Sequence, residues 1–164
     1  MEALSAGTAA PPFTLKDTGG QNRSLAEALK RGPVLLAFFK NSCPVCQFTF
    51  PFLERLYQGI KGQDGLTLWG VSQDDARDTL DFAREFGTSF PLLPDEDGYP
   101  VSNAYGLTNV PTLFLVKPDG QIQLTSVGFE RRDIERVAGE FARVAGQPIQ
   151  VFQPGENVPD SKAG

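Results

Sequence analysis

The sequence of 164 residues lacks histidine altogether and contains only two cysteines. Histidine is the commonest general base and metal ligand near neutral pH, so its absence excludes Cys–His and Ser–His catalytic pairs. Two thiolates without imidazole leave a zinc site incomplete, and an iron–sulfur cluster needs more cysteines than this chain supplies. We therefore expect no metal and no cofactor in this protein.

Basic clusters and long apolar runs are also missing. The net charge is −5 at pH 7 and the pI is about 4.7, which makes nucleic acids and anionic membranes poor partners. No apolar stretch approaches the length that crosses a bilayer. Residues 1–6 show neither the positive nor the apolar segment of a signal peptide. We therefore expect a cytoplasmic protein, although removal of a leader would leave the same sequence.

The two cysteines lie together in Ser42-Cys43-Pro44-Val45-Cys46, directly after the continuous apolar run 34–39. Such a run is typical of a strand buried on both faces, and Pro44 suits the first turn of a helix. A helix start exposes unpaired N–H groups and the positive end of the dipole, which favour a thiolate at Cys43. Cys46, one turn further on, can then attack a mixed disulfide made by Cys43. Two inert buried thiols or a fixed disulfide are the alternatives.

The rest of the pattern predicts alternating helices and strands. Ser24 and Glu27 form a capping box for a short helix, and Pro51 predicts a kink in the helix that follows the cysteines. We expect helices over 24–29, 44–58, 76–86, 101–105 and 131–144, with strands over 34–39, 66–71, 90–93, 112–116 and 122–126. This order predicts an α/β fold with a mixed central sheet and helices on both faces.

We expect one domain, because a chain of this length buries enough surface for a single core. Residues 1–11 predict a flexible lead-in, 12–145 the folded domain, and 146–164 an irregular tail with little to bury. Trp69 is expected in the core of a strand. The acidic residues Asp74, Asp75, Asp78 and Asp81 are expected to cap a helix and to form a solvated face.

Several segments resemble the thioredoxin-like superfamily, namely Phe38 to Cys46, Pro51 in the following helix, and Val110-Pro111-Thr112. Within it, the chain is similar to the TlpA/ResA type of thiol-disulfide oxidoreductase. The supporting features are segment 13–17, the extra segment near 74–105, Tyr105-Gly106-Leu107 and the Pro118-Asp119-Gly120 turn. The related alkyl hydroperoxide reductase/redoxin group shares this pattern. Two positions depart from it: Ser42 stands where the family usually has Trp, and Ala37 where thioredoxin has a buried Asp.

The resemblance implies a thioredoxin-like fold over residues 12–145 and a cis-proline at Pro111 beside the dithiol. It implies that Cys43 attacks a disulfide, that Cys46 resolves the mixed disulfide, and that the Val110 backbone pairs with an extended substrate strand. Ser42 and Pro44, on either side of Cys43, are expected at the substrate. We expect a disulfide-containing protein substrate, an external thiol electron donor and a monomeric enzyme without a metal.

Two other functions use the same fold. A peroxiredoxin-like thiol peroxidase, with antioxidant activity, normally has Thr or Ser three residues before its reactive cysteine, whereas this chain has Lys40 there. A non-catalytic redox sensor would change a partner surface when its disulfide forms. Dithiol exchange agrees better with the cysteine spacing than either alternative.

Overall fold

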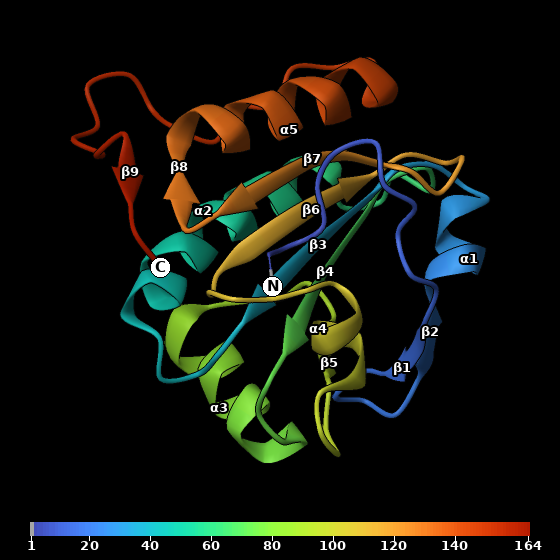
Figure 1. Cartoon of the computed structure of the whole chain (residues 1–164). Coiled ribbons are helices and arrows are strands. Elements are labelled where there is room, and N and C mark those ends of the chain that lie inside the picture. Colours follow the sequence, from blue (N-terminus) through green and yellow to red (C-terminus); the bar gives the residue numbers. More distant parts are fainter. Residues whose placement is uncertain (1) are drawn as a thin grey trace.

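The computed structural model describes residues 2–164, and its centre is a five-stranded mixed sheet in the order β5-β4-β3-β6-β7 (Figure 1). Strand β4 is parallel to β3 and β5, whereas β6 is antiparallel to both β3 and β7. The strands of the sheet are β3 (Val34–Phe39), β4 (Thr67–Ser72), β5 (Leu92–Pro94), β6 (Thr112–Val116) and β7 (Ile122–Val127).

Within residues 2–164, five helices and two small strand pairs surround the sheet. The helices are α1 (Leu25–Leu29), α2 (Pro44–Ile60), α3 (Ala76–Phe86), α4 (Pro100–Ala104) and α5 (Arg131–Ala145). The strand pairs are β1 (Thr14–Lys16) with β2 (Asn22–Ser24), and β8 (Phe129–Glu130) with β9 (Ser161–Lys162). The predicted elements are therefore confirmed in type and order, with boundaries that differ by a few residues.

Strand β3 is buried at every position because both faces of the sheet are covered. Successive side chains on a strand point to opposite faces. Leu35, Ala37 and Phe39 pack in the cluster that contains α2, α3 and α5. Their neighbours 34, 36 and 38 pack in the cluster that contains α1, α4 and Trp69. The prediction of a mixed sheet with helices on both faces is confirmed, and Trp69 is a core residue.

Local capping explains where several helices begin. The Ser24 hydroxyl accepts the N–H of Glu27 at 3.3 Å, as the capping box predicts. Asp75 caps α3 and accepts the N–H of Asp78 at 2.8 Å. Helix α2 starts at Pro44 as expected and contains Pro51, whose predicted kink stays a prediction.

Helix α2 extends to Ile60, beyond the expected end at residue 58, and Gly59 is a packing position inside it. A Cβ atom at Gly59 would lie 2.8 Å from Cγ2 of Ile149 in the C-terminal segment. The absence of a side chain therefore lets residues beyond α5 approach α2 closely. The periodicity of apolar residues in the sequence does not predict this contact between α2 and the C-terminal segment.

The two terminal segments make specific contacts. Leu4 donates its N–H to the Tyr105 carbonyl at 3.1 Å, and Gly7 donates to the Ile122 carbonyl at 2.8 Å. At the other end, Val151 and Phe152 are only 3% and 7% exposed, although we expected residues 146–164 to bury little. Two apolar residues in a Pro- and Gly-rich stretch have no periodicity that predicts their burial. The domain boundaries at residues 12 and 145 stay predictions.

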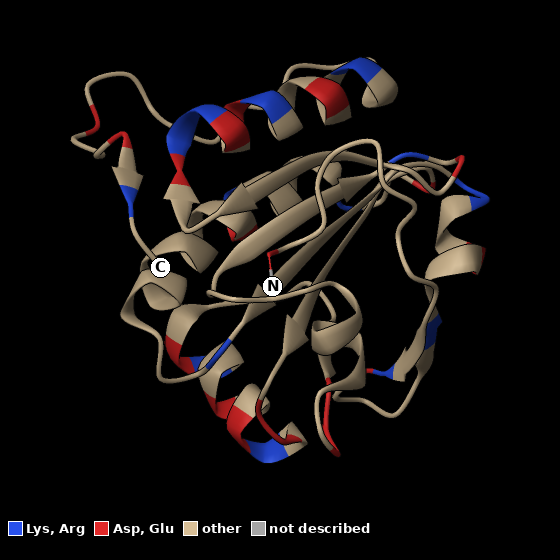
Figure 2. Cartoon of the chain, viewed as in Figure 1, with Lys and Arg blue, Asp and Glu red and all other residues tan. Residues whose placement is uncertain are grey.

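Charged residues lie on the helices, the loops and the small strand pairs rather than in the central five-stranded sheet (Figure 2). The strands β3, β4, β5, β6 and β7 contain no charged residue. Among residues 2–164, no helix combines the length and the apolar character of a membrane span.

Candidate active site

The loop between β3 and α2 carries the first cysteine and is anchored to the segment after β4. The N–H of Asn41 donates to Oδ2 of Asp74 at 2.6 Å, and its Nδ2 donates to the carbonyl of Asp78 at 2.9 Å. Gln47 of α2 in turn donates Nε2 to the Asn41 carbonyl at 2.9 Å. Because β3 and β4 are parallel, their carboxyl ends meet at one edge of the sheet, where α/β proteins place their sites.

Cys43 is the N-cap residue of α2 and is only partly buried. Its Sγ accepts the N–H of Cys46 at 3.1 Å, so the sulfur occupies the place of a capping oxygen. The thiol also donates to the carbonyl of Val110 at 3.4 Å. A thiolate at this position faces a backbone donor and the positive end of a helix of 17 residues.

Cys46 lies one turn inside α2 and is fully buried. Burial raises the pKa of the Cys46 thiol far above its ordinary value, and the hydrogen bond to Cys43 raises it further. The charges of Cys43 and Asp74 act in the same direction. Both cysteines are free thiols. The pair therefore consists of an accessible sulfur at the helix start and a protonated sulfur behind it.

The loop before β6 brings Val110 and Pro111 to the dithiol. The Val110–Pro111 peptide bond is cis. The hydroxyl of Thr112 donates to the Asn109 carbonyl at 2.8 Å, and the N–H of Gly128 donates to the Pro111 carbonyl at 2.7 Å. These bonds join the loop to the end of β7 and keep the Val110 carbonyl beside the sulfur of Cys43.

A groove of about 410 Å³ opens at Cys43 and is lined by Lys40, Cys43, Gln73, Leu107, Thr108, Asn109, Val110 and Gly164. Of the predicted site residues, Cys43 and Val110 lie in this groove. Ser42 and Pro44 are exposed on either side of Cys43 in the chain but do not line it. Pro111 and Cys46 are buried next to residues that do.

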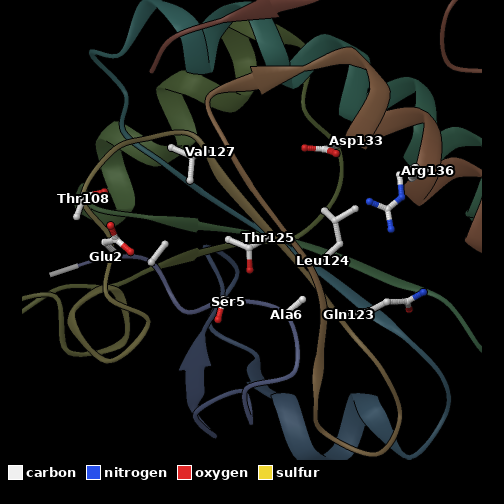
Figure 3. A pocket seen from close by; sticks show the side chains of 11 residues that line it. Glu2, Ser5, Ala6, Thr108, Gln123, Leu124, Thr125, Val127, Asp133 and Arg136 are labelled. Carbon is white, nitrogen blue, oxygen red and sulfur yellow. The ribbon is translucent and has the colours of Figure 1, made fainter.

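A larger hollow of about 550 Å³ lies between the N-terminal segment, β7 and α5 (Figure 3). Asp133 and Arg136 reach it from α5, and Ser5 and Ala6 line it from the N-terminal segment. It contains neither cysteine and shares only Thr108 with the groove at Cys43. The thiol chemistry therefore belongs to the smaller groove.

Sequence reasoning assigned Asp74 to a solvated helix cap and gave no role to Gln73 or Asn109. The structure places Gln73 and Asn109 in the groove and the carboxylate of Asp74 on the loop that carries Cys43. The parallel arrangement of β3 and β4 is the one feature of the sequence pattern that indicates these positions. Residues that follow two adjacent parallel strands meet at one edge, so the segment after β4 belongs beside the segment after β3.

Comparisons with known proteins agree with this arrangement. The AhpC/TSA family model matches residues 6–125. The thiol-disulfide oxidoreductase ResA of Bacillus subtilis is 32% identical over 122 residues, which cover 74% of this chain and 66% of ResA. ResA of Geobacillus kaustophilus is 32% identical over 136 residues, which cover 82% of this chain and 76% of that protein.

A solved structure of a thiol-disulfide oxidoreductase domain is also similar to this chain. The thioredoxin domain of a thiol-disulfide oxidoreductase from Bacteroides vulgatus superimposes with a TM-score of 0.73 at 27% identity. The match covers 85% of this chain and 99% of that domain. The similarity therefore extends over most of this chain and nearly all of that domain.

Proposed function

This chain belongs to the AhpC/TSA family and is a thiol-disulfide oxidoreductase of the ResA type, and we propose that Cys43 is its nucleophile and Cys46 its resolving thiol. One observation carries the assignment of roles. Cys43 as a residue is only partly buried and its sulfur accepts a backbone N–H at 3.1 Å, whereas Cys46 is fully buried. A disulfide that enters the groove meets Cys43 first.

The exchange proceeds in two displacements. The thiolate of Cys43 attacks one sulfur of the substrate disulfide, which forms a mixed disulfide and releases the first substrate sulfur as a thiolate. Cys46 then loses its proton and attacks the Cys43 sulfur, which releases the second substrate sulfur. The products are the Cys43–Cys46 disulfide and two substrate thiols, so two electrons have passed to the substrate.

Formation of the mixed disulfide in the first displacement makes Cys46 easier to deprotonate for the second. In the resting protein the pKa of Cys46 is raised by burial, then by the hydrogen bond to Cys43 and by the charges of Cys43 and Asp74. Once Cys43 is part of a mixed disulfide, its sulfur carries no negative charge. The contribution of Cys43 to the raised pKa is then removed, and Cys46 deprotonates more readily. Loss of this contribution favours deprotonation of Cys46 at the stage where its thiolate has to attack.

We infer that the partners are a disulfide-containing polypeptide and an external thiol that reduces the pair again. Support comes from the open groove at Cys43 and from the backbone of Val110, which lies beside the reacting sulfur. The monomeric state of the enzyme stays a prediction. The assignment of Ser42, Pro44 and Pro111 to substrate contacts and the cytoplasmic location stay predictions.

The test compares Cys43→Ser with Cys46→Ser in the reduction of insulin disulfides by dithiothreitol. We expect Cys43→Ser to lower the rate by about 100-fold or more, to the uncatalysed rate, because the attacking thiolate is lost. Cys46→Ser, reduced and then freed of dithiothreitol, should instead accumulate a mixed disulfide between Cys43 and the substrate, because no second thiol resolves it. Mass spectrometry of the alkylated protein detects this adduct. Full activity of Cys43→Ser would remove the proposal.

Hydrogen peroxide is the control substrate. A thiol peroxidase would consume it rapidly and form a sulfenic acid at Cys43. Faster consumption of peroxide than of disulfide by the reduced protein would reverse the proposed order of functions. A Cys43–Cys46 disulfide that forms without turnover of either substrate would instead indicate a redox sensor.

A further inference from the structure

The last residues of the chain form a strand next to the active site. Strand β9 pairs antiparallel with β8, with Lys162 opposite Phe129 and Ser161 opposite Glu130 (Figure 1). The approach is close, because a Cβ atom at Gly128 would lie 2.6 Å from the Lys162 carbonyl oxygen. Gly128 also donates its N–H to the Pro111 carbonyl. The tail is therefore packed against the backbone that holds the cis-proline loop.

A cation–π contact secures this strand to α2. Nζ of Lys162 lies 4.8 Å from the centre of the Phe48 ring, on the helix that begins at Cys43. Phe48 itself packs edge-on against Phe129 of β8, with ring centres 5.0 Å apart. One side chain of the tail thus contacts the aromatic surface between β8 and α2.

Beyond Lys162 the chain enters the groove of the nucleophile. Gly164 lines this groove together with Cys43 and Val110, and its carbonyl accepts Nδ2 of Asn109 at 3.4 Å. A Cβ atom on Gly164 would collide with the carbonyl oxygen of Val110. That oxygen is also the acceptor for the thiol of Cys43. The tail thus reaches the backbone group that an extended substrate strand would pair with.

We propose that residues 161–164 occupy the polypeptide-binding site of the resting protein, and that a disulfide-bearing polypeptide binds along the same path after displacing them. The path runs along β8, over Phe48, to Val110 and Cys43. It accepts an extended backbone, as in β-strand addition, and a basic side chain over Phe48. This inference deepens the proposed function and rests on it, because it assumes that Cys43 attacks a polypeptide disulfide.

The effect of the tail on the rate of disulfide reduction should depend on the size of the substrate. A polypeptide has to replace β9 to pair with β8, so the tail competes with it directly. A small disulfide such as oxidised glutathione needs access only to Cys43, a residue that is partly exposed with the tail in place. The tail should therefore slow large substrates and leave small ones almost unchanged.

The experiment compares the full chain with a variant that ends at Asp160. This end keeps the bond between the Asp160 carbonyl and the N–H of Arg131, and it keeps the buried Phe152. We expect kcat/KM for reduction of a disulfide-bonded polypeptide to rise about two- to fivefold, as loss of one weak cation–π contact and a short strand pair allows. The rate with oxidised glutathione should change by less than about twofold.

A full-length variant supports the same test without shortening the chain. Lys162→Glu places a carboxylate over the Phe48 ring, which repels the negative face of the π system. It should raise polypeptide turnover in the same direction. Lys16→Glu makes the same charge change on the exposed strand β1 and should leave turnover unchanged.

The outcomes separate this inference from the proposed function. Equal or lower polypeptide turnover in the shortened chain and in Lys162→Glu, with Cys43-dependent activity intact, would overturn the tail's role alone. Equal acceleration of both substrate sizes would also overturn it, because competition for the strand path would not be the cause. Activity that survives Cys43→Ser in the shortened chain would overturn the proposed function instead.

Discussion

At the scale of single residues, the two cysteines differ because one begins α2 and the other lies a turn inside it. Cys43 borders solvent and accepts the N–H of Cys46 at 3.1 Å. Cys46 is surrounded by the core, which raises the pKa of its thiol. Three residues of sequence therefore separate a partly exposed cysteine from a buried one, which is the difference that the proposed roles of nucleophile and resolving thiol require.

The buried thiol predicts a loss of stability in alkali. The pKa of Cys46 in the folded, reduced protein is raised above the ordinary value of 9.0 by burial, so the unfolded state releases its proton first. Its contribution to stability is complete below the unfolded pKa and falls as pH rises above it. We expect the free energy of unfolding to decrease by up to about 1.4 kcal/mol per pH unit from this group.

Urea unfolding of the reduced protein between about pH 8 and 10 measures this slope. Cys46→Ala is the matched variant and should show a shallower decline. Burial also raises the pKa of Tyr105, whose contribution is common to both proteins. Parallel alkaline slopes for the two proteins would contradict the prediction.

At the scale of elements, α2 lies close to the sheet because β4 has a glycine where the two meet. Gly70 faces Phe39 of β3 and Phe50 of α2, and the rings of these two residues have centres 4.4 Å apart. Phe82 of α3 completes the cluster. This packing determines the position of the α2 axis, and with it the position of Cys43.

Gly70→Ala should therefore destabilise the protein. The added Cβ atom would lie 2.6 Å from Cδ2 of Leu92 and 3.1 Å from Cε1 of Phe39. Neighbouring side chains in a packed core have to move, which costs about 1–3 kcal/mol. The free energy of unfolding from urea titration checks the value.

Gly139→Ala in α5 is the control, because a Cβ atom there meets nothing within 4 Å and the backbone is helical. It should stabilise the protein by about 0.5–1 kcal/mol. A neutral or stabilising effect of Gly70→Ala would show that the sheet and α2 are not packed as closely as described.

At the scale of the whole molecule, residues beyond α5 are attached to α2 by a side-chain pair and a buried ring. Arg55 donates to both carboxylate oxygens of Glu156 at 2.8 Å and to the Val151 carbonyl at 3.0 Å. Phe152 packs on Phe52 with ring centres 5.0 Å apart. These contacts set the course of the chain from the end of α5 toward the groove at Cys43.

The ion pair predicts an acid-dependent release of this segment. The bond to Arg55 lowers the pKa of Glu156 to about 2. Its contribution is therefore present above the ordinary carboxyl pKa of 4.5 and is lost as pH falls through about 2. Glu156→Gln should increase amide hydrogen exchange of residues 147–158 at neutral pH, and the difference from the unmodified protein should vanish in strong acid.

Glu140→Gln is the comparison for this measurement. Glu140 pairs with Arg143 within α5, and this partner lowers the pKa of its carboxyl in the same way. Because both residues belong to one helix, the variant should leave exchange of residues 147–158 unchanged. Equal effects of the two variants would indicate that net charge, rather than the contact with Arg55, holds the segment.

Interactions between residues that are close in the sequence were enough to predict the reactive motif and most of the helices and strands. The spacing of Cys43 and Cys46, Pro44 in the first helical turn, and the Ser24–Glu27 capping box all act within a few residues. The apolar run of β3 predicted a strand buried on both faces, which is confirmed. Resemblance to a known family added the loop at Pro111, which no local pattern places beside a cysteine.

The surroundings of the dithiol depend on contacts between residues that are far apart in the sequence. Asp74 meets Asn41 across 33 residues of sequence, and Arg55 meets Glu156 across 101. Such contacts depend on which strands are neighbours and on how closely helices approach, and neither leaves a mark on the local pattern of either partner. For the same reason the burial of Phe152 and the path of residues 161–164 to Cys43 could be seen only in the folded chain.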